Sequence, residues 1–268
     1  MEVIEFMDTE AKCKITIIGI GPGSTSLLTD EARSELRKSD IVVGYRLYLE
    51  LLASLISGQK LASFEIGQEE ERVKFAIDQS LTGKHVSVVS SGDAGIYGMG
   101  GLVLEKLTDL KLIHSVTVRI IPGISSLSSS SSLLGAPLMN DFCVMSLSDR
   151  ITPWSSIEKR INGAISGDFV MVFYNPSSNT RRDIFEKAVN LLKEKLKPGT
   201  PVGLVRNAYR DGQAVTITTL EKLYENEVDM FTTVVIGNTS TFVSGRFMIT
   251  PRGYLQQTGK SWHGSAIR

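Results

Sequence analysis

The chain has 268 residues, of which 42% are hydrophobic and 22% are charged, proportions that are ordinary for a globular protein. Lys and Arg together number 29, as do Asp and Glu, so a net charge of zero provides no field that would attract nucleic acid or an anionic membrane. Two distant cysteines and three scattered histidines argue against a disulfide framework and a metal site. With no apolar run of membrane-spanning length and no signal core, a soluble cytoplasmic protein is expected.

Short β-branched runs alternate with helix-like stretches along the first half of the chain. Strands are predicted at 15–19, 40–44, 85–90 and 116–121. A helix-like stretch follows the first strand, and another occupies 98–110. Strands separated by helices form βαβ units, so this half is expected to contain a parallel sheet.

The second half begins a new series of strands and helices. A helix is predicted at about 180–196, and strands are predicted within 142–149, 168–176, 200–208, 214–223, 230–238 and 246–254. The additional strands near 214 and 246 indicate a mixed sheet rather than a purely parallel one. The PLMND segment punctuates the pattern. It predicts an N-terminal α/β domain at 14–140 and a C-terminal α/β domain at 141–254, followed by a polar tail at 255–268.

Five consecutive serines at 128–132 could be either a flexible linker or part of a helix. They follow a predicted strand and turn, at a point where other strands of this chain lead into helices. Leu127, Leu133 and Leu134 fall roughly on one helical face, and Ser125 or Ser126 could cap the helix. Five serines in a helix cost roughly 2–3 kcal/mol relative to alanine, which tight packing can offset. An ordered helix is therefore the favoured interpretation.

Three glycine-containing loops follow predicted strands, at 19–24, 90–98 and 122–126. The first has the spacing of a dinucleotide loop, but Ser24 takes the place of the third glycine and Pro22 removes a backbone donor. The second strand also ends without a ribose-binding carboxylate, so NAD is disfavoured. Since the carboxyl ends of parallel strands share one edge, the loops are expected to converge where α/β proteins bind small molecules.

These loops, in this order, resemble those of the tetrapyrrole methylase family, whose members use S-adenosylmethionine. The similar segments are GIGPGSTSLLT, SSGDAGIYG and IIPGISS, followed by YNPSSNTRR, LVRNAYRDGQ, TTVVIGNTSTF and TPRGY, so the resemblance spans about 14–254. Within the family, the blocks VGYRLYL, LLGAPLMNDFCVMSLSDRITPWSSIEKR and DMFTTVVIGN resemble the branch that methylates carbon 17 of a corrin precursor and contracts its ring in cobalamin biosynthesis. Ser24 and the serine-rich helix depart from the family pattern without removing a side chain needed for chemistry.

The resemblance implies a class III S-adenosylmethionine methyltransferase with two α/β domains, an active-site cleft between them and a homodimeric assembly. S-adenosyl-L-methionine would be the cofactor and S-adenosyl-L-homocysteine the product. The cofactor-binding residues that the resemblance implies are Gly21, Pro22, Ser91, Gly92, Asp93, Ile96, Tyr97, Ser125, Ser126, Tyr174, Asn175, Asn207, Ala208 and Pro251. From its local sequence, Asp93 fits either a ligand of ribose hydroxyls or a helix N-cap.

The tetrapyrrole substrate carries several carboxylates, so a neutral protein needs local cations to bind it. The candidates in or beside the motif loops are Arg46, Arg150, Arg181, Arg182, Arg206 and Arg210. Relatives that methylate uroporphyrinogen have an acidic proton acceptor near the position of Tyr45, and this chain does not. Tyr45, Tyr48 and Asp149 are candidate catalytic residues that would guide protons, although packing or capping explains each of them equally well.

Several alternatives stay open on the sequence alone. A sister methylase that acts on uroporphyrinogen, precorrin-4 or another corrinoid position is an alternative, although the LSDRITPW and YNPSSNTR blocks favour the carbon-17 branch. An rRNA or diphthamide methylase lies within the same superfamily, but the zero net charge disfavours RNA. An NAD-dependent oxidoreductase is disfavoured by the first glycine loop. Metal-free precorrin-3B and cobalt-factor III fit the sequence equally as substrates.

Overall fold

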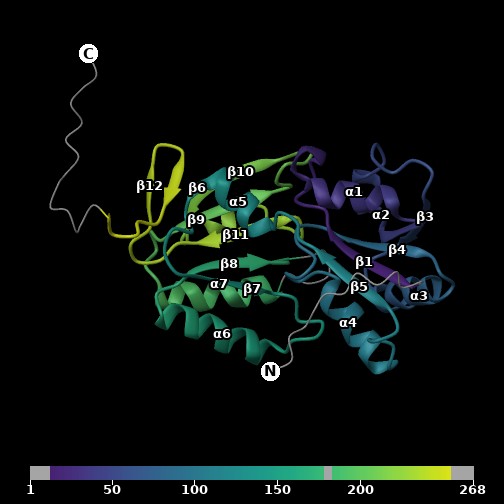
Figure 1. Cartoon of the computed structure of the whole chain (residues 1–268). Coiled ribbons are helices and arrows are strands. Elements are labelled where there is room, and N and C mark those ends of the chain that lie inside the picture. The colour runs from purple at the N-terminus through teal and green to yellow at the C-terminus, as the bar shows by residue number, and fades with distance from the viewer. Residues whose placement is uncertain (1–12, 178–182, 255–268) are drawn as a thin grey trace, which may run out of the picture. The chain divides into compact units, whose positions relative to one another are not determined.

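A computed structural model describes residues 13–177 and 183–254 of the chain. Its contacts divide the chain into two compact units, with the division after Ser126 (Figure 1). The sequence pattern predicts this division after residue 140. The difference arises because the serine-rich helix and the short strand after it pack with the second sheet, through Leu127, Leu133 and Leu134. Each unit is described in turn.

The first unit is built on a five-stranded parallel sheet with the strand order β3-β2-β4-β1-β5. The strands are β1 (Lys14–Gly19), β2 (Ile41–Tyr45), β3 (Lys60–Phe64), β4 (His85–Ser90) and β5 (Thr117–Ile121). All four pairings in this sheet are parallel, which confirms the predicted parallel sheet. Strand β3 was not predicted from the sequence.

Strand β1 illustrates why this sheet is apolar on both faces. In the segment KITIIG, Ile15 and Ile17 pack into the core on one face of the sheet, while Ile18 packs into the core on the other. All three are fully buried. Parallel strands covered on both sides have such continuous apolar runs, and this is the signal that made the strands recognisable in the sequence.

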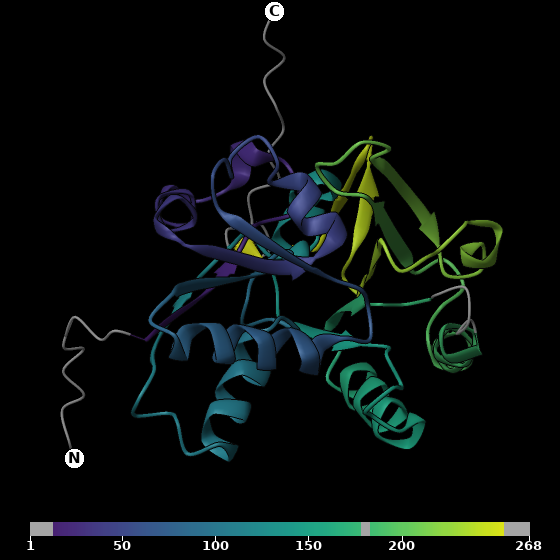
Figure 2. The ribbon, with the colours of Figure 1, turned by 90° about the vertical axis from the view of Figure 1, so that its right-hand side faces the viewer.

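Helices cover both faces of the first sheet. Helices α1 (Asp30–Lys38) and α2 (Arg46–Leu51) pack on one face, and α3 (Glu69–Leu81) and α4 (Gly100–Asp109) pack on the other (Figures 1 and 2). The chain leaves β1 through α1 in one direction along the sheet and leaves β4 through α4 in the opposite direction. The boundary between β1 and β4 is therefore a topological switch point.

The second unit contains a mixed sheet with the strand order β10-β9-β11-β8-β7. Its strands are β7 (Phe142–Ser146), β8 (Val170–Tyr174), β9 (Pro201–Arg206), β10 (Ala214–Thr219) and β11 (Thr232–Ile236). Strands β7 and β8 are parallel, whereas β11 is antiparallel to both β8 and β9. The predicted mixed character is confirmed, and β7, β8 and β9 all run in one direction.

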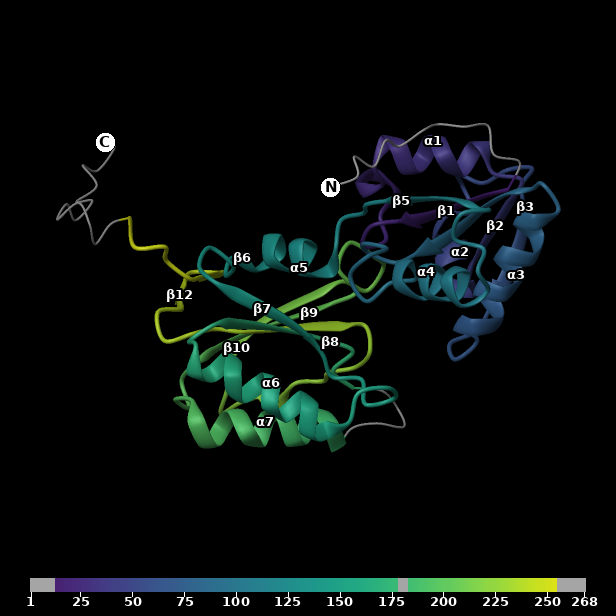
Figure 3. The ribbon, with the colours of Figure 1, turned by 60° about the horizontal axis from the view of Figure 1, so that its bottom comes forward.

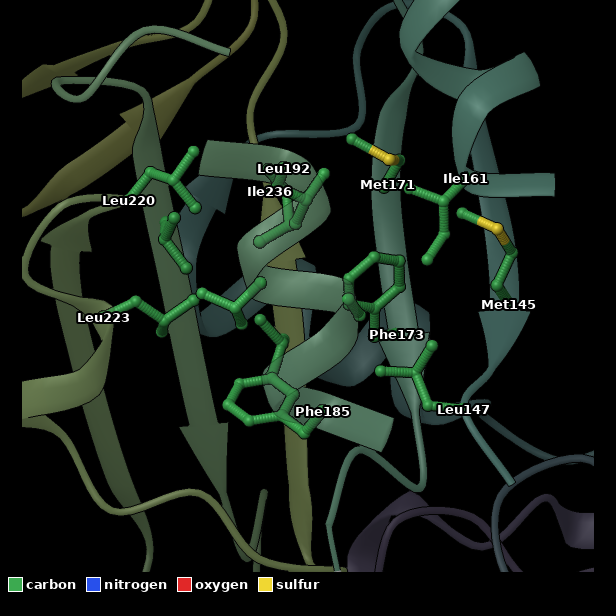
Figure 4. Close-up of a cluster of buried hydrophobic side chains, with 14 of the residues drawn as sticks. Met145, Leu147, Ile161, Met171, Phe173, Phe185, Leu192, Leu220, Leu223 and Ile236 are labelled. Carbon is green, nitrogen blue, oxygen red and sulfur yellow. The ribbon is translucent and has the colours of Figure 1, made fainter. Parts of the chain in front are cut away.

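Helices α6 (Trp154–Ser166) and α7 (Asp183–Lys195) lie next to each other on one face of this sheet (Figure 3). A buried hydrophobic cluster lies between these helices and the sheet, and it includes Phe173 and Met171 of β8 and Phe185 and Leu192 of α7 (Figure 4). The spacing of apolar residues in α7 places Ile184, Phe185 and Ala188 on its buried face. These contacts anchor the strands that end at the second unit's candidate site.

The opposite face carries the serine-rich helix and a small sheet. Helix α5 (Ser126–Leu134) confirms that the serine run is ordered. A Cβ added to Gly203 of β9 would lie 2.5 Å from a methyl carbon of Leu134, so the helix approaches the sheet closely. The small sheet has the order β12-β13-β6, from β12 (Phe242–Ser244), β13 (Phe247–Ile249) and β6 (Gly135–Ala136). Short 3-10 helices occur at η1 (Thr25–Leu27) and η2 (Leu223–Glu225).

Within the described ranges, no helix combines the length and apolar character needed to cross a membrane. The same residues contain no group of three or more His, Cys, Asp or Glu side chains arranged to hold a metal ion.

Candidate functional site

The loops after β1 and β4 are joined at the switch point of the first sheet. The Ile20 N–H donates to the Ser90 carbonyl at 2.9 Å. Gly21 and Gly92 then exchange two backbone hydrogen bonds, at 3.0 and 2.8 Å, and form an isolated antiparallel bridge. Both glycines have positive φ angles, of 72° and 66°, which disfavour side chains. The two loops are thus fixed together at the place where open α/β sheets bind ligands.

The loop after β5 packs tightly against this pair. A Cβ added to Gly123 would lie 2.2 Å from the Gly92 carbonyl oxygen, and one added to Gly19 would lie 2.6 Å from the Gly123 nitrogen. Neither position can accept a side chain without movement of the backbone. The predicted convergence of the three loops is therefore present, and it depends on the absence of side chains.

Asp93 holds the second and third loops in register. Its Oδ1 accepts a hydrogen bond from the Gly95 N–H at 2.8 Å, and its Oδ2 accepts one from the Gly123 N–H at 3.0 Å. The carboxylate therefore bridges the loops that follow β4 and β5. This contact differs from the helix N-cap considered for Asp93, and it gives the residue a positioning role at the site.

The residues after Asp93 form an exposed turn. Tyr97 has a φ of 53°, and its side chain is 56% exposed. A left-handed conformation is costly for an aromatic residue, and such strain often accompanies a binding loop. A Cβ on Gly98 would meet the Ala94 carbonyl at 2.6 Å and the Ser90 hydroxyl at 2.7 Å, so the turn leaves no room for a side chain at this position.

The second unit has a comparable edge, where β7, β8 and β9 all end. Asn175 follows β8 and Asn207 follows β9, and both have left-handed φ angles, of 52° and 49°. The Asn175 side-chain amide donates to the Ser146 hydroxyl at 3.2 Å, and the Asn207 N–H donates to the Phe231 carbonyl at 3.1 Å. Asparagine tolerates this backbone region better than most residues. Two of the expected cofactor residues, Asn175 and Asn207, therefore occupy left-handed turns at the ends of β8 and β9, which run in the same direction.

The remaining expected cofactor residues of the second unit are placed differently. The Tyr174 hydroxyl accepts a hydrogen bond at 2.6 Å from the Leu127 N–H at the start of α5. Ala208 packs partly into the core beneath the sheet. Pro251 follows Thr250, whose N–H donates to the Ala136 carbonyl at 3.1 Å, so Pro251 lies just beyond the end of the small sheet.

Two of the arginines expected to bind substrate already have carboxylate partners. Arg46 pairs with Glu50 at 2.8 Å and with Glu65 at 3.2 Å. Arg206 Nε pairs with Asp229 Oδ2 at 2.7 Å. These hydrogen bonds raise the pKa of both guanidinium groups. The charges of both arginines are therefore largely neutralised within the chain.

The other expected arginines differ in how they are held. Arg150 is exposed in the loop after β7. The Arg210 N–H donates to the Asn207 carbonyl at 3.0 Å, so it lies in the turn after β9. Arg181 and Arg182 lie outside the described residues.

The candidate proton-guiding residues divide between the units. Tyr45 ends β2 and Tyr48 lies in α2, where the two rings meet edge to face with centroids 5.2 Å apart. Asp149 follows β7 in the second unit. An aromatic pair of this kind contributes packing as well as two hydroxyl groups.

Sequence reasoning missed one residue at the carboxyl edge of the first sheet. Arg72, in the first turn of α3, is only 4% exposed. A signal for it exists, because Arg72 falls on the same helical stripe as the buried residues Val73, Ala76, Ile77 and Ser80. An arginine on an apolar stripe is unusual, because burying a charge is costly.

Comparisons with known proteins agree with the geometry. Residues 14–224 match the model of the tetrapyrrole (corrin/porphyrin) methylases. The chain is 47% identical over 245 residues to cobalt-factor III methyltransferase of Priestia megaterium, which covers 91% of this chain but only 45% of that protein. It is 45% identical over 240 residues to the probable cobalt-factor III C(17)-methyltransferase of Salmonella typhimurium, covering 90% of this chain and 99% of that one. The crystal structure of the methyltransferase CobJ superposes with a TM-score of 0.84 at 33% identity, covering 89% of this chain and all of the other.

Proposed function

Because the chain belongs to the tetrapyrrole (corrin/porphyrin) methylase family, we propose that it methylates carbon 17 of a corrin precursor in cobalamin biosynthesis. The reaction would use S-adenosyl-L-methionine and contract the macrocycle, giving the precorrin-4 stage or its cobalt form. The similarity to the Salmonella protein, which extends over 99% of that protein's length, carries the proposal. The Priestia protein is more than twice as long as the matched segment, so the activity of its whole chain is not transferred by identity alone.

The residues of the three joined loops fit a cofactor of this kind. Glycines at the crossing allow the backbone to approach a ligand, and a Cβ added to Gly92 would come within 3.6 Å of Ser125 and Ser126. When bound, S-adenosyl-L-methionine supplies a methyl group already activated on a sulfonium. We assign its binding in the first unit to Gly21, Pro22, Ser91, Gly92, Asp93, Ile96, Tyr97, Ser125 and Ser126.

Residues of the second unit are proposed to complete cofactor binding. They are Tyr174, Asn175, Asn207, Ala208 and Pro251. The left-handed turns at the two asparagines support this assignment, because they present backbone groups at the ends of β8 and β9. The main contributions of the protein are then alignment of the reacting carbon and exclusion of water.

The arginines would bind the peripheral carboxylates of the substrate. Arg150 and Arg210, with Arg181 and Arg182, are assigned to this role. Arg46 and Arg206 can contribute only by exchanging an internal carboxylate for one of the substrate. Tyr45, Tyr48 and Asp149 are assigned to the movement of protons during rearrangement of the macrocycle. The family resemblance also supports a homodimer in the cytoplasm.

Anaerobic incubation tests the proposal directly. The chain would be mixed with S-adenosyl-L-methionine and either cobalt-factor III or precorrin-3B. The expected product has one added methyl group at carbon 17, measured by mass and nuclear magnetic resonance, with an absorbance change that reports ring contraction. A methyl group at another carbon would favour a sister methylase. Thermal protection by S-adenosyl-L-homocysteine, but not by NAD, separates this class from an oxidoreductase.

A further inference from the structure

The guanidinium group of Arg72 is buried with incomplete hydrogen bonding. Its Nη2 donates to the Glu65 carbonyl at 3.2 Å. Its Nη1 is 3.5 Å from the sulfur of Met99, which is a weak acceptor. The buried Nε has no acceptor among the residues that the structure describes. A guanidinium with five donors is therefore held by one good hydrogen bond and one weak one.

The charge of Arg72 is also not neutralised locally. Within residues 13–177 and 183–254, no carboxylate lies within ion-pair distance of it. Burial lowers the pKa of Arg72, and the more distant charge of Glu69 only partly offsets this effect. Glu69 instead accepts a hydrogen bond from the Gly67 N–H, and the Glu65 carboxylate is paired with Arg46. Buried charges in proteins are normally paired, so this one requires an explanation.

Arg72 lies at the carboxyl edge of the first sheet, close to the candidate site. Helix α3 runs back along the parallel sheet, so its first turn lies at the carboxyl edge. Glu65 follows β3 directly, and Met99 ends the loop that follows β4 and that contains Gly92 and Asp93. Arg72 therefore lies at the edge that holds the joined loops, and it contacts the end of one of them.

We propose that Arg72 binds a peripheral carboxylate of the tetrapyrrole substrate. This inference deepens the proposed function and rests on it. A carboxylate matches the planar guanidinium in shape and supplies the negative charge that none of the described residues places beside it. It would take the place of the Met99 sulfur, which is a poor acceptor on a flexible, unbranched side chain.

The sequence suggests Arg46 as a ligand of the substrate carboxylates, but the structure favours Arg72 for this role. Arg46 lies in a family motif, at the start of α2, but it is exposed and paired with two carboxylates. Arg72 lies outside the motifs, but it is buried and has no carboxylate partner among the residues that the structure describes. An unpaired cation in low-dielectric surroundings attracts an anion far more strongly than an exposed, neutralised one.

The test compares Arg72→Met and Arg72→Lys with the parent chain and with Lys74→Met, which removes an exposed cation from the same helix. Anaerobic titrations would measure the dissociation constants for cobalt-factor III and for S-adenosyl-L-homocysteine. Arg72→Met is expected to weaken cobalt-factor III binding by about 10-fold to 100-fold. It should change the dissociation constant for S-adenosyl-L-homocysteine by less than about twofold. Arg72→Lys should restore part of the loss. KM should rise more than kcat falls.

The thermal melt of the unliganded protein separates binding from a structural role. Since Arg72→Met removes an unpaired buried charge, its melting temperature should equal or exceed that of the parent chain. A variant that melts lower or fails to fold, or that loses both ligands equally, would show that Arg72 is structural and would overturn the inference. Unchanged cobalt-factor III affinity would overturn it as well. Failure of the parent chain to bind cobalt-factor III would instead refute the proposed function on which the inference rests.

Discussion

The two edges of the first sheet treat buried charge in opposite ways. At the amino edge, the Glu35 side chain is only 2% exposed and is surrounded by basic groups. Its partners are Lys14 at 2.5 Å, His85 at 3.2 Å, Arg119 at 3.5 Å and Lys38 at 3.8 Å. At the carboxyl edge, Arg72 is buried without a carboxylate partner among the described residues. One edge satisfies its charge internally, and the other retains capacity for a ligand.

The same contrast holds for the backbone. At the amino edge, the side chain of Asp40 accepts the His85 N–H at 2.9 Å, and Ser39 and Ser87 share a hydrogen bond of 2.5 Å. At the carboxyl edge, the backbones of the loops meet directly at Gly19, Gly92 and Gly123, and the Asp93 carboxylate bridges two of the loops. The stabilising charge cluster and the proposed binding site therefore lie at opposite ends of one set of strands, and ligands of open parallel sheets usually bind at the carboxyl end.

The largest effect on stability is expected from Glu35→Gln. This change replaces the buried carboxylate with a neutral amide, and it should reduce the free energy of unfolding by about 3 kcal/mol, since the hydrogen bonds of Lys14 and Arg119 to Glu35 are no longer charge-assisted on both sides. Urea denaturation measures the loss. Glu31→Gln is the matched control, because Glu31 also contacts Arg119 but is 48% exposed. Equal losses in the two variants would contradict the idea that the amino edge is a stabilising cluster.

Gly123→Ala should disrupt the carboxyl edge. The added Cβ would meet the Gly92 carbonyl oxygen at 2.2 Å, a backbone atom that cannot move independently. We expect a loss of about 2 kcal/mol in stability and a large loss of S-adenosyl-L-homocysteine affinity in calorimetry. Gly101→Ala serves as the control, since its Cβ meets nothing within 4 Å in α4, and it should be neutral or stabilising. If both variants bound the ligand like the parent chain, the joined loops would not form the cofactor site.

Asp93→Asn tests the bridge between the second and third loops. An amide keeps one acceptor oxygen but turns a donor toward the other glycine N–H, so one of the two bonds is lost. The expected cost is about 1–2 kcal/mol, confined to this edge. Hydrogen exchange should accelerate at the amide of Gly95 or Gly123 while the amides of β1 remain protected. Unchanged exchange at both glycines would show that the carboxylate does not hold the loops.

The smallest expected effect is a pH dependence that comes from the amino edge. Burial acts to raise the pKa of Glu35, but the hydrogen bond and charge of Lys14, with His85 and Lys38, outweigh it and leave that pKa lowered. Burial, with the charge of Lys14, also lowers the pKa of His85. In both cases the unfolded chain binds protons more readily than the folded one, so stability falls as pH falls.

The two pH windows are distinct. The His85 contribution should be lost as pH falls below about 6.5, and the Glu35 contribution as pH falls below about 4.3, each through the lower pKa of the folded state. Denaturation measured across this pH range should show that the free energy of unfolding falls less steeply with acidification in Glu35→Gln than in the parent chain. His85→Gln should remove only the part of the loss that occurs at about pH 6.5. A parent chain whose stability rose on acidification would contradict both assignments.

Local patterns in the sequence accounted for much of this fold. Apolar runs such as that of β1 identified the strands, and Leu127, Leu133 and Leu134 identified the serine-rich segment as a helix. Strand β3 was missed because its segment, KLASF, is largely exposed and lacks a continuous apolar run. The predicted division after residue 140 differs from the observed one after Ser126 because the packing of α5 against the second sheet is a long-range contact that no local pattern records.

The candidate site was only partly predictable for a related reason. Glycine spacing is a local property, so the three loops and their convergence could be read from residue order and from the geometry of parallel strands. The state of a charge is not set by local sequence alone, because Arg206 is paired with Asp229 and Glu35 is paired with residues of three strands. The sequence by itself therefore determined which backbone turns form the site. Only the tertiary structure decided which charged groups are already paired and which, like Arg72, are left to a ligand, because pairing depends on distances between residues that are far apart in the chain.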